Sequence, residues 1–121
     1  MRRAACAVAI LMAAGCGPKN PETFNLKSGT GVVRHVKFEQ GANVQIWVES
    51  EEDSDVDLFV YDKAGTRVAA DERIDKNCHV TFKPESTQKY KIEVVNRVFK
   101  EPQMLHKNRD NRCTLRWEPK E

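Results

Sequence analysis

The sequence contains no apolar run long enough to cross a bilayer, since the longest, from Ala4 to Ala14, has only 11 residues. Aromatic residues make up only 7% of the 121, and four cysteines are too few for a disulfide-dense scaffold. The sequence also has no excess of one charge: when Arg2 and Arg3 are left out, the remaining 18 basic residues balance 18 acidic ones. Such a chain has no overall field that would attract nucleic acid or an anionic membrane. Its length and its 40% hydrophobic content predict one folded domain.

The first 16 residues have the pattern of a secretion signal, with Arg2 and Arg3 before the short apolar run. Their end, Ala13-Ala14-Gly15-Cys16, resembles the lipobox of bacterial lipoproteins, although Ala13 stands where that family usually has Leu. The resemblance implies a signal peptide at 1–15 and fatty acids such as palmitate on Cys16, where two or three chains would anchor the protein firmly. Gly17 then favours the outer membrane, because Asp at this place retains lipoproteins of enteric bacteria at the inner one. The alternative is an ordinary signal peptide that leaves Cys16 as a thiol.

Two cysteines remain once Cys6 leaves with the leader and Cys16 carries lipid. Cys78 and Cys113 would lie outside the reducing cytosol, so we expect a disulfide between them. The bond would close a loop of 36 residues, which the chain-entropy relation equates with roughly 3–4 kcal/mol. Zinc is disfavoured because the sequence has no Cys-x-x-Cys.

Residues 16–30 are rich in proline, glycine and polar groups, and we expect them to hold the lipidated cysteine and a flexible linker. From residue 31 to 121 apolar residues alternate with polar ones, which is typical of half-buried strands. Val44, Ile46 and Val48 are one such set, and Tyr90, Ile92 and Val94 are another. Seven or eight short strands with turn residues between them predict an all-β, antiparallel, jelly-roll-like β-sandwich.

The same strands carry a family resemblance. The alternating run 44–50, the segment Asp55-Val-Asp-Leu-Phe-Val-Tyr-Asp62 and the strand Tyr90-Lys-Ile-Glu-Val94 resemble the bacterial pre-peptidase C-terminal (PPC) domain. The resemblance covers residues 31–117. It implies a sandwich used as an accessory or binding module, and some collagenase-associated relatives bind calcium.

Six carboxylates lie within residues 49–57, with no basic residue among them. Asp53, Asp55 and Asp57 have the spacing of the first three calcium ligands of an EF-hand. Leu58 and Ala64 occupy the positions where that motif needs Gly and Glu, so these residues are weak calcium candidates. The alternative is a solvated acidic turn.

Two surface features are candidates for contact with a partner. The first is the long connection between the last two strands, whose basic residues include Arg97, Lys100, Lys107 and Arg109. Long loops in small domains are often functional. The second is Trp47, which with Phe59 and Tyr61 would form an aromatic patch if their strands were neighbours.

The sequence contains no catalytic motif, and we expect a non-catalytic, lipid-anchored module of the cell envelope that binds an envelope protein or a polysaccharide. Two other functions remain open. The chain could be a structural or assembly subunit of an envelope complex, or a calcium-binding accessory domain. A small hydrolase is disfavoured, because nothing in the sequence signals a pocket that would separate the pKa values of two carboxylates.

Overall fold

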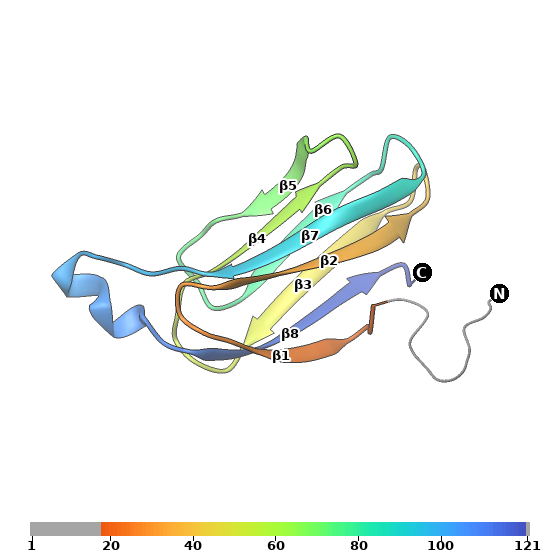
Figure 1. The fold of residues 1–121 in the computed structure, drawn as a ribbon. Coiled ribbons are helices and arrows are strands. Elements are labelled where there is room, and N and C mark those ends of the chain that lie inside the picture. Colours follow the sequence, from red (N-terminus) through yellow and green to blue (C-terminus); the bar gives the residue numbers. More distant parts are fainter. Residues whose placement is uncertain (1–17, 121) are drawn as a thin grey trace.

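The alternating pattern forms eight strands and one short 3-10 helix in the computed structural model, which describes residues 18–120 (Figure 1). The elements are β1 (Glu22–Leu26), β2 (Gly31–Phe38), β3 (Val44–Ser50), β4 (Val56–Tyr61), β5 (Arg67–Asp71), β6 (Cys78–Phe82), β7 (Gln88–Asn96), η1 (Pro102–Lys107) and β8 (Asn111–Glu118). Val44, Ile46 and Val48 are buried while Gln45 and Trp47 between them are only half-buried, as period-two packing requires.

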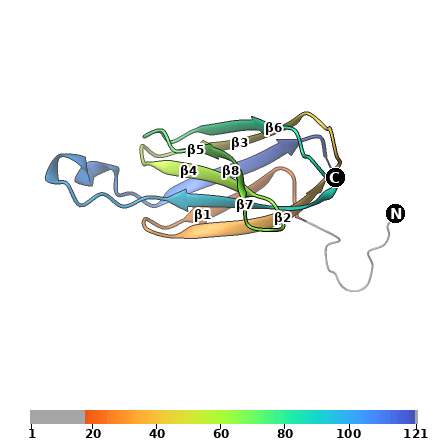
Figure 2. The same ribbon diagram turned by 90° about the horizontal axis from the view of Figure 1, so that it is seen from above.

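The strands form two antiparallel sheets of four, with the orders β1-β8-β3-β6 and β2-β7-β4-β5. The sheets stack face to face (Figure 2). This is the strand order of a jelly roll, in which consecutive strands mostly alternate between the two layers. The predicted all-β, jelly-roll-like sandwich is therefore confirmed.

The core lies between the two sheets and contains one large buried residue from nearly every strand. Trp117, Tyr90 and Phe38 are its largest side chains. Phe38, Phe82 and Tyr90 contact one another, with ring centroids 5.2–6.1 Å apart. Burial of such rings supplies much of the free energy that holds two sheets together.

The sandwich begins earlier in the chain than the sequence suggested. Residues 22–26, which we expected in the flexible linker, form the edge strand β1 and pair with β8 over their whole length. Asn20 is also held, because its side chain donates to the carbonyl of Trp117 at 2.9 Å and accepts from the amide of Trp117 at 3.1 Å. The linker prediction is therefore wrong for residues 20–26. The alternation of Phe24 and Leu26 was too short a signal to identify a strand. The signal peptide and Cys16 lie outside the described residues.

The predicted disulfide is also wrong for this structure, in which Cys78 and Cys113 are both free and buried. They lie in β6 and β8, which flank β3 on its two sides in one sheet. Two strand spacings separate them by at least about 9 Å, whereas a disulfide needs Cα atoms within about 7 Å. Each sulfur is hydrogen bonded locally: Cys78 donates to the carbonyl of Val56 at 2.9 Å, and Ser50 donates to Cys113 at 3.3 Å.

Because neighbouring strands are antiparallel, the connections gather at two ends of the sandwich (Figures 1 and 2). We call one the entry end: residues 18–21, 39–43, 62–66, 83–87 and 119–120. The other, the arm end, holds residues 27–30, 51–55, 72–77 and 97–110. The last of these connections, which contains η1, projects well beyond the strands. We call residues 97–110 the arm.

Candidate functional site

The arm extends from the sandwich as a narrow projection whose two sides are joined near its base. The Asn108 side chain accepts from the amide of Phe99 at 2.8 Å and donates to the carbonyl of Phe99 at 2.9 Å. The Asn108 side chain thus satisfies both backbone groups of Phe99, as a residue of a neighbouring strand would, and holds the base of the arm in one conformation. No residue of η1 is buried, and Val98 and Leu105 are 49% and 50% exposed. The arm therefore presents apolar side chains to solvent on a braced base.

The acidic segment and the basic arm, which are far apart in the sequence, meet at the arm end. Three arm residues form ion pairs with this segment: Lys107 with Asp53 at 2.7 Å, Arg109 with Glu52 at 2.8 Å, and Arg97 with Asp57 at 2.8 Å. Arg112, just after the arm, lies 3.7 Å from Glu51. Opposite charges thus neutralise each other within the chain.

Because of these ion pairs, most basic residues of the arm are not available to contact a partner's acidic groups. Arg97, Lys107 and Arg109 face carboxylates of their own chain, so they do not form the free positive patch that the sequence suggested. Lys100 is exposed and forms no ion pair within residues 18–120. The exposed ion pairs themselves contribute little free energy, but together they fix the direction in which the arm leaves the body.

Two buried asparagines connect the arm to its surroundings. The Asn111 carbonyl oxygen accepts from the amides of Glu51 and Glu52 at 3.1 and 2.7 Å, and its nitrogen donates to the carbonyl of Glu52 at 2.7 Å and to the Ser54 hydroxyl at 2.6 Å. The Asn96 side chain donates to the carbonyls of Leu26 and Arg109 at 3.0 and 2.7 Å. These residues were missed in the sequence. Their one signal is an amide on the inward phase of β7 and β8, where the strands otherwise carry apolar side chains.

Asp55 and Asp57 are a buried carboxyl pair, only 3% and 0% exposed. Oδ2 of Asp57 accepts from Arg97, but Oδ1 of each carboxyl has no hydrogen-bond partner in residues 18–120 when both are ionised. Burial and, next to it, the neighbouring charge of Asp57 together raise the pKa of Asp55 to about 6, against the lowering effect of Arg97. Burial also raises the pKa of Asp57, against the lowering effect of Arg97. A single proton shared by the pair explains the two partnerless oxygens.

The three calcium candidates do not converge. Asp53 is exposed and paired with Lys107, while Asp55 and Asp57 are buried beside the Arg97 guanidinium. Across the described part of the chain, no three His, Cys, Asp or Glu side chains are placed to hold one ion. The positive charge beside this carboxyl pair is the guanidinium of Arg97.

The aromatic patch, which required neighbouring strands, does not form, because its members lie on opposite outer faces of the sandwich. Trp47 is on the β1-β8-β3-β6 sheet, stacked on His79 with centroids 5.2 Å apart, and the Arg116 guanidinium lies 3.8 Å from its centroid. Phe59 and Tyr61 are on the other sheet. Cations cover these two rings as well: Arg67 and Lys91, each at 4.7 Å. Trp47 is therefore occupied on its faces by its own chain.

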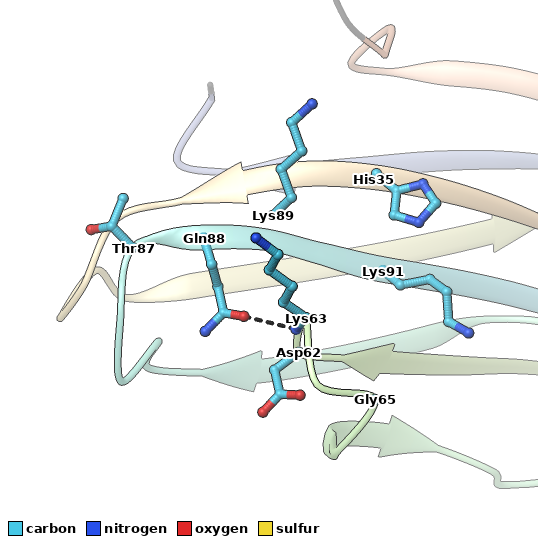
Figure 3. A pocket seen from close by; sticks show the side chains of 8 residues that line it. All are labelled: His35, Asp62, Lys63, Gly65, Thr87, Gln88, Lys89 and Lys91. Carbon is cyan, nitrogen blue, oxygen red and sulfur yellow. Dashed lines mark hydrogen bonds between the residues drawn. The ribbon is translucent and has the colours of Figure 1, made fainter.

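A surface cavity of about 500 Å³ lies on the outer face of the β2-β7-β4-β5 sheet, towards the entry end (Figure 3). Its charged lining comes from three segments: His35 of β2, Lys89 and Lys91 of β7, and Asp62 and Lys63 of the β4–β5 turn. The amide of Lys63 donates to the Gln88 side chain at 2.7 Å, which joins the turn to β7 (Figure 3). The cavity is open and mostly cationic. Its lysines fall on the polar phase of their strands, so the sequence pattern marks them only as exposed residues.

Comparison with known proteins adds no identification, since the sequence matches no protein-family model and no curated protein. Within residues 18–120, no helix has the length and apolar character needed to span a bilayer.

Proposed function

We propose that this chain is a non-catalytic, lipid-anchored binding module of a bacterial cell envelope, and that it contacts a protein partner through the arm. In this proposal the lipid is on Cys16, the membrane is the outer one, and the domain is a relative of PPC domains. The jelly-roll order is consistent with that relationship. The observation that carries the proposal is the arm itself, an exposed apolar projection that contributes nothing to the core.

The construction of the arm favours a binding function. Ordering a flexible loop on binding costs free energy, so a segment that is already held in shape binds more tightly. Asn108 holds the base, and the pairs Lys107–Asp53 and Arg109–Glu52 hold the arm against the acidic segment. Val98 and Leu105 would then supply apolar contact to a partner. Apolar side chains suit a protein surface better than a polysaccharide.

The location of the most perturbed acid supports a function without catalysis. A carboxyl with a pKa near 6 is a candidate general acid only where a substrate can reach it. Asp55 and Asp57 are buried, and the carboxylate of Asp57 is paired with the Arg97 guanidinium. This pair therefore fits a structural role at the base of the arm.

Crosslinking in intact cells tests the proposed contact. A photoreactive amino acid replaces Leu105 in one variant and Val33 in another; both sites are exposed and apolar, but Val33, 40% exposed, lies on the outer face of β2. We expect one dominant protein adduct from position 105 and none at the same yield from position 33. Equal yields from the two positions, or no adduct at 105, would contradict binding through the arm. An adduct that accounts for nearly all copies of the chain would favour a permanent assembly subunit.

The anchor has its own test. Mass spectrometry of the mature protein should find a chain that begins at Cys16 and carries two or three fatty acids. A chain that retains residues 1–15, or an unmodified Cys16, would refute the anchor.

A further inference from the structure

Cations without an ion-pair partner gather at the entry end. Of the seven arginines in the described range, six form ion pairs and Arg116 lies over Trp47. At or beside the entry end most positive residues are lysines, although Arg67 opens β5 there and pairs with Glu72. Five of the lysines form no ion pair within residues 18–120: Lys19, Lys63, Lys83, Lys89 and Lys120. The carboxylates at this end are Glu22, which pairs with Arg34, Glu39, which is 3.8 Å from Lys37, and Asp62, Glu85 and Glu118; the sequence adds Glu121 after Lys120. The positive charge is concentrated at the cavity, where Lys63, Lys89 and Lys91 share the lining with a single carboxylate, that of Asp62.

The proposed lipid would hold the same end against a membrane. Asn20 is fixed to Trp117 by two hydrogen bonds. Four residue steps from Cys16 to Asn20 span at most about 14 Å when fully extended. This is a much shorter tether than a flexible linker up to residue 30 would provide. Because the chain enters at this end, a lipid on Cys16 leaves it close to the bilayer surface and directs the arm away (Figure 1).

We propose, on the basis of the anchor proposed above, that the entry end docks on anionic phospholipid headgroups and that the cavity containing Lys63 and Lys89 receives a headgroup phosphate. Lysine binds phosphate as a compact point charge. Lys63, Lys89 and Lys91 surround an open volume of about 500 Å³, with the Thr87 hydroxyl and the Gln88 amide as further polar groups (Figure 3). The lipid supplies attachment, and the lysines supply orientation.

The orientation of the arm is the functional consequence. A domain on a short tether without surface contacts rotates, and the arm then points in many directions. Docking of the entry end keeps the arm at the far side of the sandwich, away from the bilayer. Each lysine near an anionic surface contributes about a fivefold preference for the docked state.

The test uses the full lipidated protein in vesicles, after mass spectrometry has shown the lipid on Cys16. A fluorophore is placed at the entry end in an Ala64→Cys variant or on the arm in a Gln103→Cys variant; both positions are exposed, and the native thiols Cys78 and Cys113 are buried. Headgroup-attached quenchers report proximity to the surface. We expect strong quenching at position 64 and little at position 103 in phosphatidylethanolamine vesicles with roughly 30% phosphatidylglycerol. About 0.5 M salt should abolish the difference.

A matched pair of double variants separates docking from general charge. Lys63→Gln with Lys89→Gln should lower the docked-to-undocked ratio about 25-fold. Lys76→Gln with Lys100→Gln removes the same charge at the arm end and should leave the ratio unchanged. If both double variants lowered the ratio equally, or if position 64 were quenched equally without phosphatidylglycerol, the proposed docking surface would be refuted. The lipid anchor would not be affected by either result. If Lys63 and Lys89 bound a soluble acidic polysaccharide while the quenching did not depend on phosphatidylglycerol, the ligand of this surface would be the polysaccharide and not the membrane. An unmodified Cys16 would instead refute the proposed anchor, before any docking is measured.

Discussion

Replacement of Asp55 by asparagine should stabilise this protein at neutral pH. Asp55 is 3% exposed, its pKa is raised to about 6, and its Oδ1 has no partner while Asp57 is ionised. The asparagine has the same shape but no charge. Its NH2 group can donate to the partnerless Oδ1 of Asp57, so the substitution removes a buried like-charge contact and adds a hydrogen bond.

The magnitude follows from the shift in pKa. A carboxyl with an ordinary pKa near 4 and a folded value of about 6 destabilises the folded state by about 3 kcal/mol when ionised. Because the folded state holds the proton more tightly, the contribution of Asp55 to stability is most favourable below pH 4, declines as the pH rises from 4 to 6, and then stays constant. The value of about 6 already includes the opposing effect of Arg97, whose charge favours an ionised Asp55. The buried amide of the asparagine has a desolvation cost of its own, which offsets part of the gain. We therefore expect a gain of roughly 1–3 kcal/mol at pH 7.5 and almost none at pH 4.

Urea unfolding measures this difference, with the fluorescence of buried Trp117 as the signal. Both proteins share the opposite contribution of Asp71, whose pKa is lowered to about 2 by hydrogen bonds from Arg73 and whose stabilising effect is lost as the pH falls below 4. The difference between variant and parent therefore isolates the Asp55–Asp57 pair. The control is Asp53→Asn at the exposed neighbour, which should leave the stability close to that of the parent at both pH values, because exposed ion pairs contribute little. A variant that is less stable than the parent at pH 7.5, or equally shifted at both pH values, would refute the buried carboxyl pair.

Other predictions concern the thiols, the first strand and the base of the arm. Burial raises the pKa of the thiols of Cys78 and Cys113, so a thiol reagent should modify neither in the folded protein and both in urea; a mass 2 Da below that of the reduced chain would contradict free thiols. Glu22 of β1 pairs at 2.6 Å with Arg34 of β2, in the other sheet, so Glu22→Gln should speed hydrogen exchange in β1 several-fold at a cost of about 1 kcal/mol; unchanged exchange would show that this ion pair does not hold β1 in place. Asn111→Ala should cost about 2–4 kcal/mol in urea unfolding because it leaves buried polar groups without partners, and a loss below 0.5 kcal/mol would argue against that network.

Most of the fold could be predicted from the sequence because the signal is local. A half-buried strand shows its period within five to eight residues, and Val44, Ile46 and Val48 are buried as their spacing required. The strand at residues 22–26 was missed because Phe24 and Leu26 lie among prolines and polar residues. Its identity as a strand depends on β8, which comes at the other end of the chain.

The candidate site could be predicted only in part. Its basic loop and acidic segment were both visible, but not that they neutralise each other, because Lys107 and Asp53 are 54 positions apart and meet only after the strands are ordered. Asn111 gave almost no signal, since an amide on an apolar phase could equally be a weak strand position. The lysines around the cavity looked like ordinary solvated residues.

Composition and alternation of residues were enough to determine that this chain builds two stacked sheets, because each strand buries its apolar phase whatever its neighbours are. Strand order decided the rest. It put β3 between Cys78 and Cys113, placed Trp47 and Phe59 on opposite faces, and joined Asp57 to Arg97. Cross-strand distances depend on which segments become neighbours, and only the packing of the whole core selects that arrangement.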